Sequence, residues 1–182
     1  MGFNSTIISK KKRCKTCGNK DYIFSHGECK QCSTISSTKK RMAEFEDKEE
    51  SESLQNLVED LDAIFSIYIR TKDANKYGCV TCYTCGLEFN YKEVDCGHFI
   101  PRANMATRFE VSNCKPQCKT CNQYKDGNIE AYEKHLEQDR KGTVEYLREL
   151  GRTTYKYSID ELKSMVGEYR HKVQILKNKF QW

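Results

Sequence analysis

The sequence lacks any long hydrophobic run, and apolar residues make up only 37% of its 182 residues. No segment approaches the roughly 20 consecutive apolar residues that span a bilayer, so we expect no membrane-spanning helix. The opening residues, MGFNSTIISKKKR, contain no apolar stretch typical of a secretory signal, which favours a cytoplasmic protein. The low apolar content also argues against one large hydrophobic core, and domains with little core need staples such as metal ions or disulfides.

Apolar residues are scarce, but cysteine is abundant: the chain carries eleven cysteines, most of them in C-x-x-C pairs. An odd number does not suit a disulfide framework, which favours an even count behind a secretory signal. In a reducing cytosol, paired cysteines are typical of zinc sites. We therefore expect small domains held together by zinc.

The net charge is +5, but the charges are distributed unevenly. Residues 44–62 hold nine acidic side chains and one basic one, and the remainder holds 30 basic against 17 acidic. A basic body with one acidic segment suits a polyanion such as nucleic acid as partner. An ordinary soluble surface is the alternative, and charge alone does not separate the two.

Apolar spacing predicts a helix over residues 54–70, with Ser53 as its N-cap. The apolar stripe of this helix must be covered, either by the next domain or by a second copy of the chain. Residues 33–53, rich in serine and then in charge, are predicted to be a linker or a solvated helix. The last helix is predicted to start at Ser158, because Glu161 three residues later completes a capping box.

Between these helices the pattern changes. Residues 77–101 are predicted to form a β-hairpin region, and residues 102–117 a loop. A helix is expected to begin at the cysteine pair that follows, and another near residues 128–140. Residues 143–150 are predicted to be helical, with Gly151 placed just after the helix end.

Two C-x-x-C pairs near the start of the chain predict a first zinc site. The four thiolates would complete a tetrahedron about 2.3 Å from the ion. All four positions would then be filled by protein, so the site would be structural, and it would serve for docking or simply for folding. The predicted ligands are Cys14, Cys17, Cys29 and Cys32.

A second zinc site is predicted from residue 79 onward. Cys118 and Cys121 form one pair, and Cys82 joins either Cys79 or Cys85 in the other. Gly86 favours Cys82 and Cys85, because a glycine after the second thiolate lets backbone amides turn toward the sulfurs.

The residues between and after these pairs predict a third metal site, of a different kind. Asp95 and His98 lie between the pairs, and Asn122 directly follows the last cysteine. Oxygen ligands such as those of Asp95 and Asn122 suit a hard ion like Mg²⁺ or Mn²⁺. A neutral histidine can take a proton from water near pH 7. A zinc clamp would bring the three side chains together although they are far apart in sequence.

This order of residues resembles the HNH endonucleases. Residues from about 64 to 150 more closely resemble the phage recombination nuclease family NinG, also called Rap, whose members are regarded as nucleases of branched DNA. The spacing is also similar to endonuclease VII, a phage Holliday-junction resolvase. The matching residues are Cys82, Cys85, Gly86, Asp95, Gly97, His98, Thr107, Arg108, Phe109, Asn113, Gln117, Cys118, Cys121, Asn122, Gly127 and Asn128.

The resemblance implies roles for individual residues. His98 would be the general base, Asp95 and Asn122 the metal ligands, and Asn113 the residue that braces the loop carrying the base. The chain departs from many HNH enzymes in having Gly97 directly before the base, and in having Asn122 where they have a histidine. Nearby basic residues are expected to contact phosphates without reading bases: Arg102, Arg108, Lys115, Lys119 and Lys125.

The resemblance also implies a fold, which is α+β, small and metal-stapled. A zinc-ribbon-like module (1–35) would be followed by a charged linker with the amphipathic helix (36–75). An HNH core of the ββα-metal type (76–150) and a C-terminal helix (151–182) would complete the chain. A phage or prophage in a bacterial host would encode it.

The expected function is that of a divalent-metal endonuclease that cuts Holliday junctions, D-loops or similar recombination intermediates, leaving 5′-phosphate ends. Two symmetric cuts would require a homodimer, and a recombinase is a further expected partner. One alternative is a non-catalytic zinc protein that binds branched or single-stranded DNA, and another is a sequence-specific homing or restriction enzyme. An RNA-binding zinc protein is disfavoured, because no RRM-like aromatic motif is present.

Overall fold

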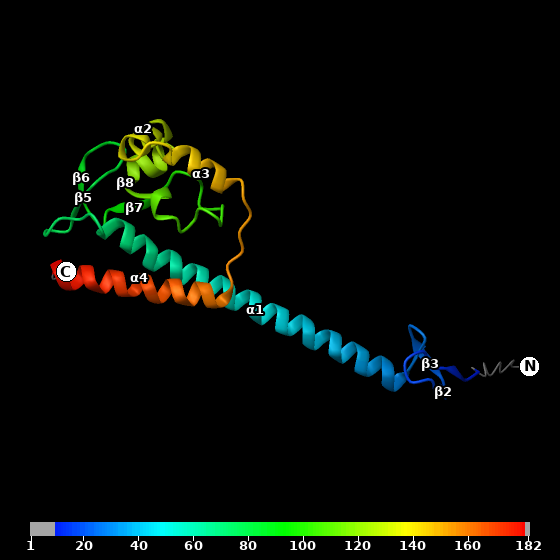
Figure 1. Cartoon of the computed structure of the whole chain (residues 1–182). Coiled ribbons are helices and arrows are strands. Elements are labelled where there is room, and N and C mark those ends of the chain that lie inside the picture. The colour runs from blue at the N-terminus through cyan, green and yellow to red at the C-terminus, as the bar shows by residue number, and fades with distance from the viewer. Residues whose placement is uncertain (1–9, 181–182) are drawn as a thin grey trace, which may run out of the picture. The chain divides into compact units, whose positions relative to one another are not determined.

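The computed structural model describes residues 10–180 (Figure 1), which fall into two compact units divided between Glu52 and Ser53. The ends of the first and last predicted domains, residues 1–9 and 181–182, lie outside the described residues. Within the described range, no helix combines the length and the apolar character needed to cross a bilayer.

The N-terminal unit contains two short antiparallel hairpins. Strand β1 (Lys12–Arg13) pairs with β2 (Lys20–Asp21), and β3 (Ile23–Ser25) pairs with β4 (Glu28–Cys29). Gly18 and Gly27 adopt φ of 74° and 82°, which side chains other than hydrogen disfavour. These glycines let the chain turn tightly after the first cysteine pair and before the second.

Helix α1 (Lys30–Thr71) is much longer than the predicted helix over 54–70. It starts directly after β4 and contains no proline or glycine, and its first half is rich in Lys and Glu, which favour helix. Residues 34–51 are all exposed. The linker alternative for residues 33–53 is therefore wrong, the solvated helix is confirmed, and Ser53 is an interior residue rather than an N-cap.

In the second unit, the apolar stripe of α1 is covered by helix α4 (Ile159–Phe180), which lies beside it (Figure 1). Phe65 and Tyr169 meet edge to face with ring centroids 4.9 Å apart. The stripe thus packs within the chain, as one of the two sequence-based alternatives expected. The buried members of this core are Leu61, Phe65, Ile69, Phe109, Cys114, Leu162, Val166 and Tyr169.

Two further antiparallel pairs follow α1. Strand β5 (Cys79–Thr81) pairs with β6 (Glu88–Asn90), and β7 (Val94–His98) pairs with β8 (Cys114–Cys118). The prediction of a loop over 102–117 is wrong at its end, where a 3₁₀ turn η1 (Val111–Asn113) leads into β8. The segment CKPQC hides its strand character, because it has no β-branched residue and Pro116 lacks an N–H.

The remaining helices complete a small α+β structure. A π-helical turn η2 (Thr120–Tyr124) follows β8, and α2 (Ile129–Asp139) and α3 (Thr143–Gly151) come next. The capping box before α4 is confirmed, since Ser158 N donates to Glu161 at 2.8 Å and Glu161 N to the Ser158 hydroxyl at 3.3 Å. Gly151 belongs to the last turn of α3 and does not follow it, so its prediction as the residue after the helix is wrong.

Candidate active site

Two groups of four cysteines bring their sulfurs together, each within 4.8 Å of the others. In the first, the backbone N–H of Cys29 donates to the sulfur of Cys14 at 3.3 Å. In the second, the N–H of Cys118 donates to Cys82 at 3.3 Å. The groups are Cys14, Cys17, Cys29 and Cys32, and Cys82, Cys85, Cys118 and Cys121.

Both groups fit a zinc ion. The backbone N–H groups of Cys17 and Cys29 lower the pKa of Cys14 to about 6. Burial acts to raise the pKa of Cys82, but the backbone N–H groups around its sulfur outweigh burial and lower it to about 6. Four thiolates leave no open coordination position, so each group suits a structural ion rather than a catalytic one.

The second group shows which cysteine pairs with Cys82. Cys85 lies in the group, whereas Cys79 lies in β5 and outside it. A zinc ion here would tie the turn after β5 to the end of β8 and to η2. A hydrogen bond also fixes the pair of strands β7 and β8 to this turn: Tyr83 N donates to the Pro116 carbonyl at 2.8 Å.

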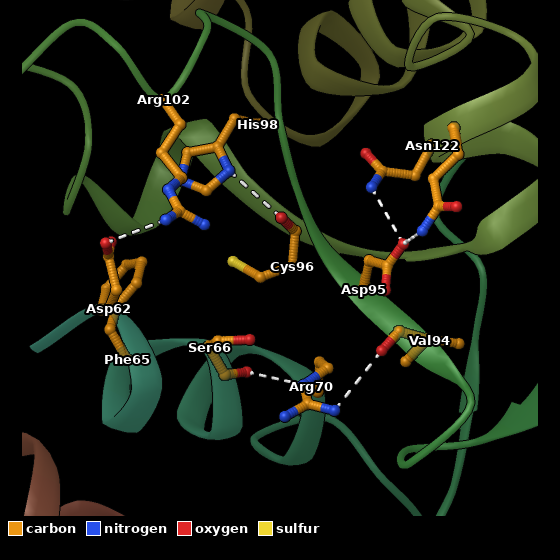
Figure 2. Close-up of a pocket in the computed structure, with 11 residues that line it drawn as sticks. Asp62, Phe65, Ser66, Arg70, Val94, Asp95, Cys96, His98, Arg102 and Asn122 are labelled. Atoms are coloured by element: carbon orange, nitrogen blue, oxygen red, sulfur yellow. Dashed lines mark hydrogen bonds and ion pairs between the residues drawn. The ribbon is translucent and has the colours of Figure 1, made fainter. Parts of the chain in front are cut away.

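A pocket of about 430 Å³ opens between β7 and the second half of α1 (Figure 2). Three of the four predicted catalytic side chains line it, namely Asp95, His98 and Asn122, whereas Asn113 is not part of the lining. Strand alternation places Asp95 on one face of β7 and His98 on the other, and both side chains line this pocket. Its lining is Asp62, Phe65, Ser66, Arg70, Val94, Asp95, Cys96, His98, Arg102, Asn122 and Gln123.

Both ring nitrogens of His98 lie 3.1 Å from backbone carbonyls: Nδ1 from that of Cys96 and Nε2 from that of Arg108. A neutral imidazole has one N–H, so it can donate to only one of them. Burial lowers the pKa of His98 below its ordinary value, against the two carbonyl contacts, which raise it. The ring is therefore neutral near pH 7 and keeps one nitrogen lone pair.

On the other face of β7, Asp95 accepts hydrogen bonds from two side-chain amides. Its Oδ2 accepts from Asn122 Nδ2 at 3.0 Å and from Gln123 Nε2 at 2.8 Å (Figure 2). Rotating the Asn122 amide by half a turn would set two oxygens side by side, an arrangement that suits a hard cation such as Mg²⁺. His98 makes no hydrogen bond with this group among the described residues.

Asn113 holds together the loop between β7 and β8. Its Oδ1 accepts from the Ile100 N–H at 2.7 Å, and its Nδ2 donates to the carbonyls of Ile100 and Thr107 at 3.1 and 3.0 Å. The buried Tyr132 of α2 adds hydrogen bonds to the carbonyls of Gly97 and Asn113, both at 3.1 Å. Together they fix the strand end that carries His98.

The predicted phosphate-contacting residues lie in different surroundings. Arg108 is mostly buried and ion-paired with Asp62, whereas Arg102 is 61% exposed, lines the pocket and meets Asp62 at 3.2 Å. Lys115 pairs with Asp139 at 3.3 Å and lies over the ring of Tyr83. Lys119 and Lys125 are exposed.

Sequence reasoning missed the wall that α1 contributes. Asp62, Ser66 and Arg70 line the pocket, and Arg70 donates to the Tyr91 and Val94 carbonyls at 3.2 and 3.5 Å. These three residues are spaced one per turn of α1. From the sequence, this spacing predicts only that they share the helix face next to the apolar stripe, not that they line a pocket. Gln123 was also missed, although its position directly after Asn122 was a signal.

Comparisons with known proteins point to one family. The family model described as Bacteriophage Lambda NinG protein matches residues 7–179 of this chain. The protein named ninG of Escherichia phage lambda is 29% identical over 113 residues, which cover 61% of this chain and 52% of that protein.

Other phage proteins match over the same length. The ninG protein of Salmonella phage P22 is 28% identical over 113 residues, and that of Escherichia phage 933W is 26% identical, each with 61% of this chain and 53% of the relative covered. The chain thus spans about half the length of the curated relatives it matches. No solved structure matches it.

Proposed function

The chain belongs to the bacteriophage lambda NinG protein family, and we propose that it is a metal-dependent DNA endonuclease with an HNH core of the ββα-metal type. The observation that carries the proposal is the shared pocket of Asp95, His98 and Asn122. Strands β7 and β8 and the turn η2 would be the two strands and the helix of that core. A zinc ion on the second cysteine group would hold these elements in place.

In this proposal His98 is the general base. The Cys96 side of the ring faces the pocket, because Cys96 lines it and Arg108 does not. We assign the ring hydrogen to Nε2, which donates to the Arg108 carbonyl, so that a small ring rotation that breaks the 3.1 Å contact of Nδ1 with the Cys96 carbonyl would turn the Nδ1 lone pair toward the pocket. There it can take a proton from a water molecule that attacks the phosphorus.

Asp95 and Asn122 would hold Mg²⁺ or Mn²⁺, with Gln123 steadying the Asp95 carboxylate. A divalent ion bound there would stabilise the negative charge that develops on the phosphate. Arg102, exposed at the rim of the pocket, would contact a neighbouring phosphate. The proposed substrates are branched recombination intermediates.

The test is a nicking assay with Mg²⁺ on supercoiled plasmid and on a panel of linear, forked and four-way DNA. We expect wild type to prefer branched substrates. His98→Ala should lose at least 100-fold in rate, on the order of what general-base loss costs. His171→Ala is the matched control, because His171 is an exposed histidine on α4.

Zinc content and DNA binding should be equal in the three proteins, which shows that a lost rate is not lost folding. If wild type cuts no DNA yet binds branched DNA, a non-catalytic zinc protein is the better description. If one linear sequence is cut best whatever the branching, the protein is a sequence-specific enzyme.

A further inference from the structure

A third group of metal-ligating side chains lies beside the proposed catalytic residues. The sulfurs of Cys96 and Cys114 and a ring nitrogen of His98 all lie within 4.8 Å of one another. Cys96 and His98 are two residues apart on β7, so they share a face, and Cys114 is the direct partner of His98 on β8. Antiparallel pairing therefore builds this cluster from three residues of one sheet face.

We propose that Cys96, His98 and Cys114 form a third zinc site, separate from the Mg²⁺ site at Asp95, and that zinc bound there inhibits the nuclease. The inhibition rests on the proposed function, but the binding does not. Two thiolates about 2.3 Å from zinc in a tetrahedron lie about 3.8 Å apart. The ligand atoms of the cluster lie within 4.8 Å of one another, so they would have to approach by about 1 Å at most to bind one ion.

The two faces of β7 offer ligands of different chemistry. On one face Asp95 presents oxygen beside Asn122, which suits a hard ion such as Mg²⁺. On the other face Cys96, Cys114 and His98 present sulfur and nitrogen, which suit zinc. Figure 2 shows the Cys96 sulfur directed toward the side of His98 and Asp62 and away from Asp95. Each ion therefore has its own face of the strand.

The cluster is reachable from the pocket. Cys96 and His98 line it, while Cys114 is fully buried beneath them. Three protein ligands leave the fourth tetrahedral position for a water molecule from the pocket. This distinguishes the cluster from the two groups of four cysteines, whose coordination would be closed.

Zinc at this cluster would act on His98 alone. A nitrogen lone pair that binds a metal ion cannot take a proton from water, so the base is lost while Asp95 and Asn122 stay intact. Inhibition should therefore persist when Mg²⁺ is raised. Zinc that merely displaced Mg²⁺ from Asp95 would instead be outcompeted by it.

Binding is tested by calorimetric titration of Zn²⁺ into reduced holoprotein that already holds two zinc ions per chain. We expect a third equivalent in wild type. Cys96→Ser and Cys114→Ala should each weaken it about 100-fold or more, since loss of an outer ligand-orienting group alone costs 10–100-fold. Cys79→Ser should leave it unchanged, because Cys79 is a free cysteine of the same unit outside all three groups.

A third equivalent that survives in both Cys96→Ser and Cys114→Ala, or is absent from wild type, overturns the site. Circular dichroism and the count of two tightly held zinc ions identify a variant that has misfolded, and Cys96→Ser is the milder of the two because Cys96 is only half-buried.

Inhibition is tested by nicking with Zn²⁺ added at saturating Mg²⁺, each variant being compared with its own rate without added zinc. The zinc concentration that halves the rate should rise at least tenfold in Cys96→Ser and should not change in Cys79→Ser. Relief of inhibition by excess Mg²⁺ overturns the regulatory part. If wild type binds the third ion but has no nuclease activity, the proposed function fails and the metal site stands.

Discussion

Gly97 shows at the scale of one residue why this strand carries no side chain directly before His98. A Cβ atom on Gly97 would lie 2.0 Å from Oε1 of Gln117 and 2.6 Å from its Cδ. Gln117 is fully buried and cannot swing away, because its Nε2 donates to Thr84 at 3.1 Å and to the Gly127 carbonyl at 2.7 Å. Its amide fills the space that another side chain would need, which leaves Asp95 as the carboxylate of this strand face.

Gly97→Ala should therefore destabilise the second unit by about 1–3 kcal/mol, the usual cost of overpacking. Urea unfolding followed by circular dichroism measures this change. Gln117→Ala removes the clashing amide, so the double variant should be more stable than the sum of the two single changes predicts. Additive effects would show that the contact between Gly97 and Gln117 is not the cause.

The pKa of His98 predicts the acid limb of the rate profile. Burial lowers this pKa below the ordinary 6.5. A general base works only when neutral, so the rate should be on its plateau at pH 7 and should fall as the pH drops through the lowered pKa. Single-turnover nicking between about pH 5 and 8, without added zinc, should give a midpoint below 6.5. A midpoint above 6.5 would contradict His98 as the buried base.

At the scale of elements, the pocket depends on two helices from opposite ends of the unit. The second half of α1 supplies one wall, and α4 holds α1 in place through the core around Phe65 and Tyr169. Arg70 joins α1 to β7 through the Val94 carbonyl. A residue on α4 can thus influence the pocket without touching it.

Leu162→Ala tests this dependence. Leu162 is fully buried in the core between α4 and α1, so its truncation should cost about 2–5 kcal/mol of unfolding free energy. Ile175→Ala, on the same helix and 52% exposed, should cost little. Urea denaturation compares the two, and equal midpoints would mean that α4 does not stabilise the unit.

At the scale of the whole molecule, each compact unit has its own group of four cysteines. A structural zinc ion in each would make metal binding part of the folding free energy of that unit. Loss of one ion should therefore be felt within its own unit.

Cys17→Ser should abolish zinc binding by the first cysteine group and leave hydrogen-exchange protection over residues 53–180 unchanged. Cys121→Ser should also remove one ion but should lower that protection, because Cys121 lies beside the hairpin of β7 and β8. Elemental analysis and hydrogen exchange by mass spectrometry report both effects. Loss of protection over 53–180 in Cys17→Ser would show that the units do not fold separately.

The proposed function predicts a homodimer, because resolution of a four-way junction requires two symmetric cuts. The apolar stripe of α1 over 54–70 is covered by α4, so another surface would have to supply the interface. Light scattering at working concentration should give twice the mass of the chain, or should do so when four-way DNA is added. A monomer bound to each junction would contradict the expectation.

Much of the second unit was predictable because its signals are local. C-x-x-C spacing, the order of Asp95, His98 and Asn122, and the capping box at Ser158 each depend on a few neighbouring residues. The helical period predicted α1 where one face is apolar. The same period did not predict where α1 begins. The first half of the helix is exposed and has no apolar stripe, so only the intrinsic helix propensity of its residues favours helix there.

The sequence by itself determined which side chains are available: eight cysteines in C-x-x-C pairs, and a histidine, a carboxylate and a carboxamide between and after them. The tertiary structure confirmed that Cys85 rather than Cys79 joins the second cysteine group, as Gly86 had favoured. It alone decided that residues 114–118 form a strand beside β7 and that α1 closes the pocket with Asp62, Ser66 and Arg70. The reason is physical. Covalent spacing fixes partners a few residues apart, whereas partners tens of residues apart are selected by strand register and by the burial of helix faces, to which the whole chain contributes.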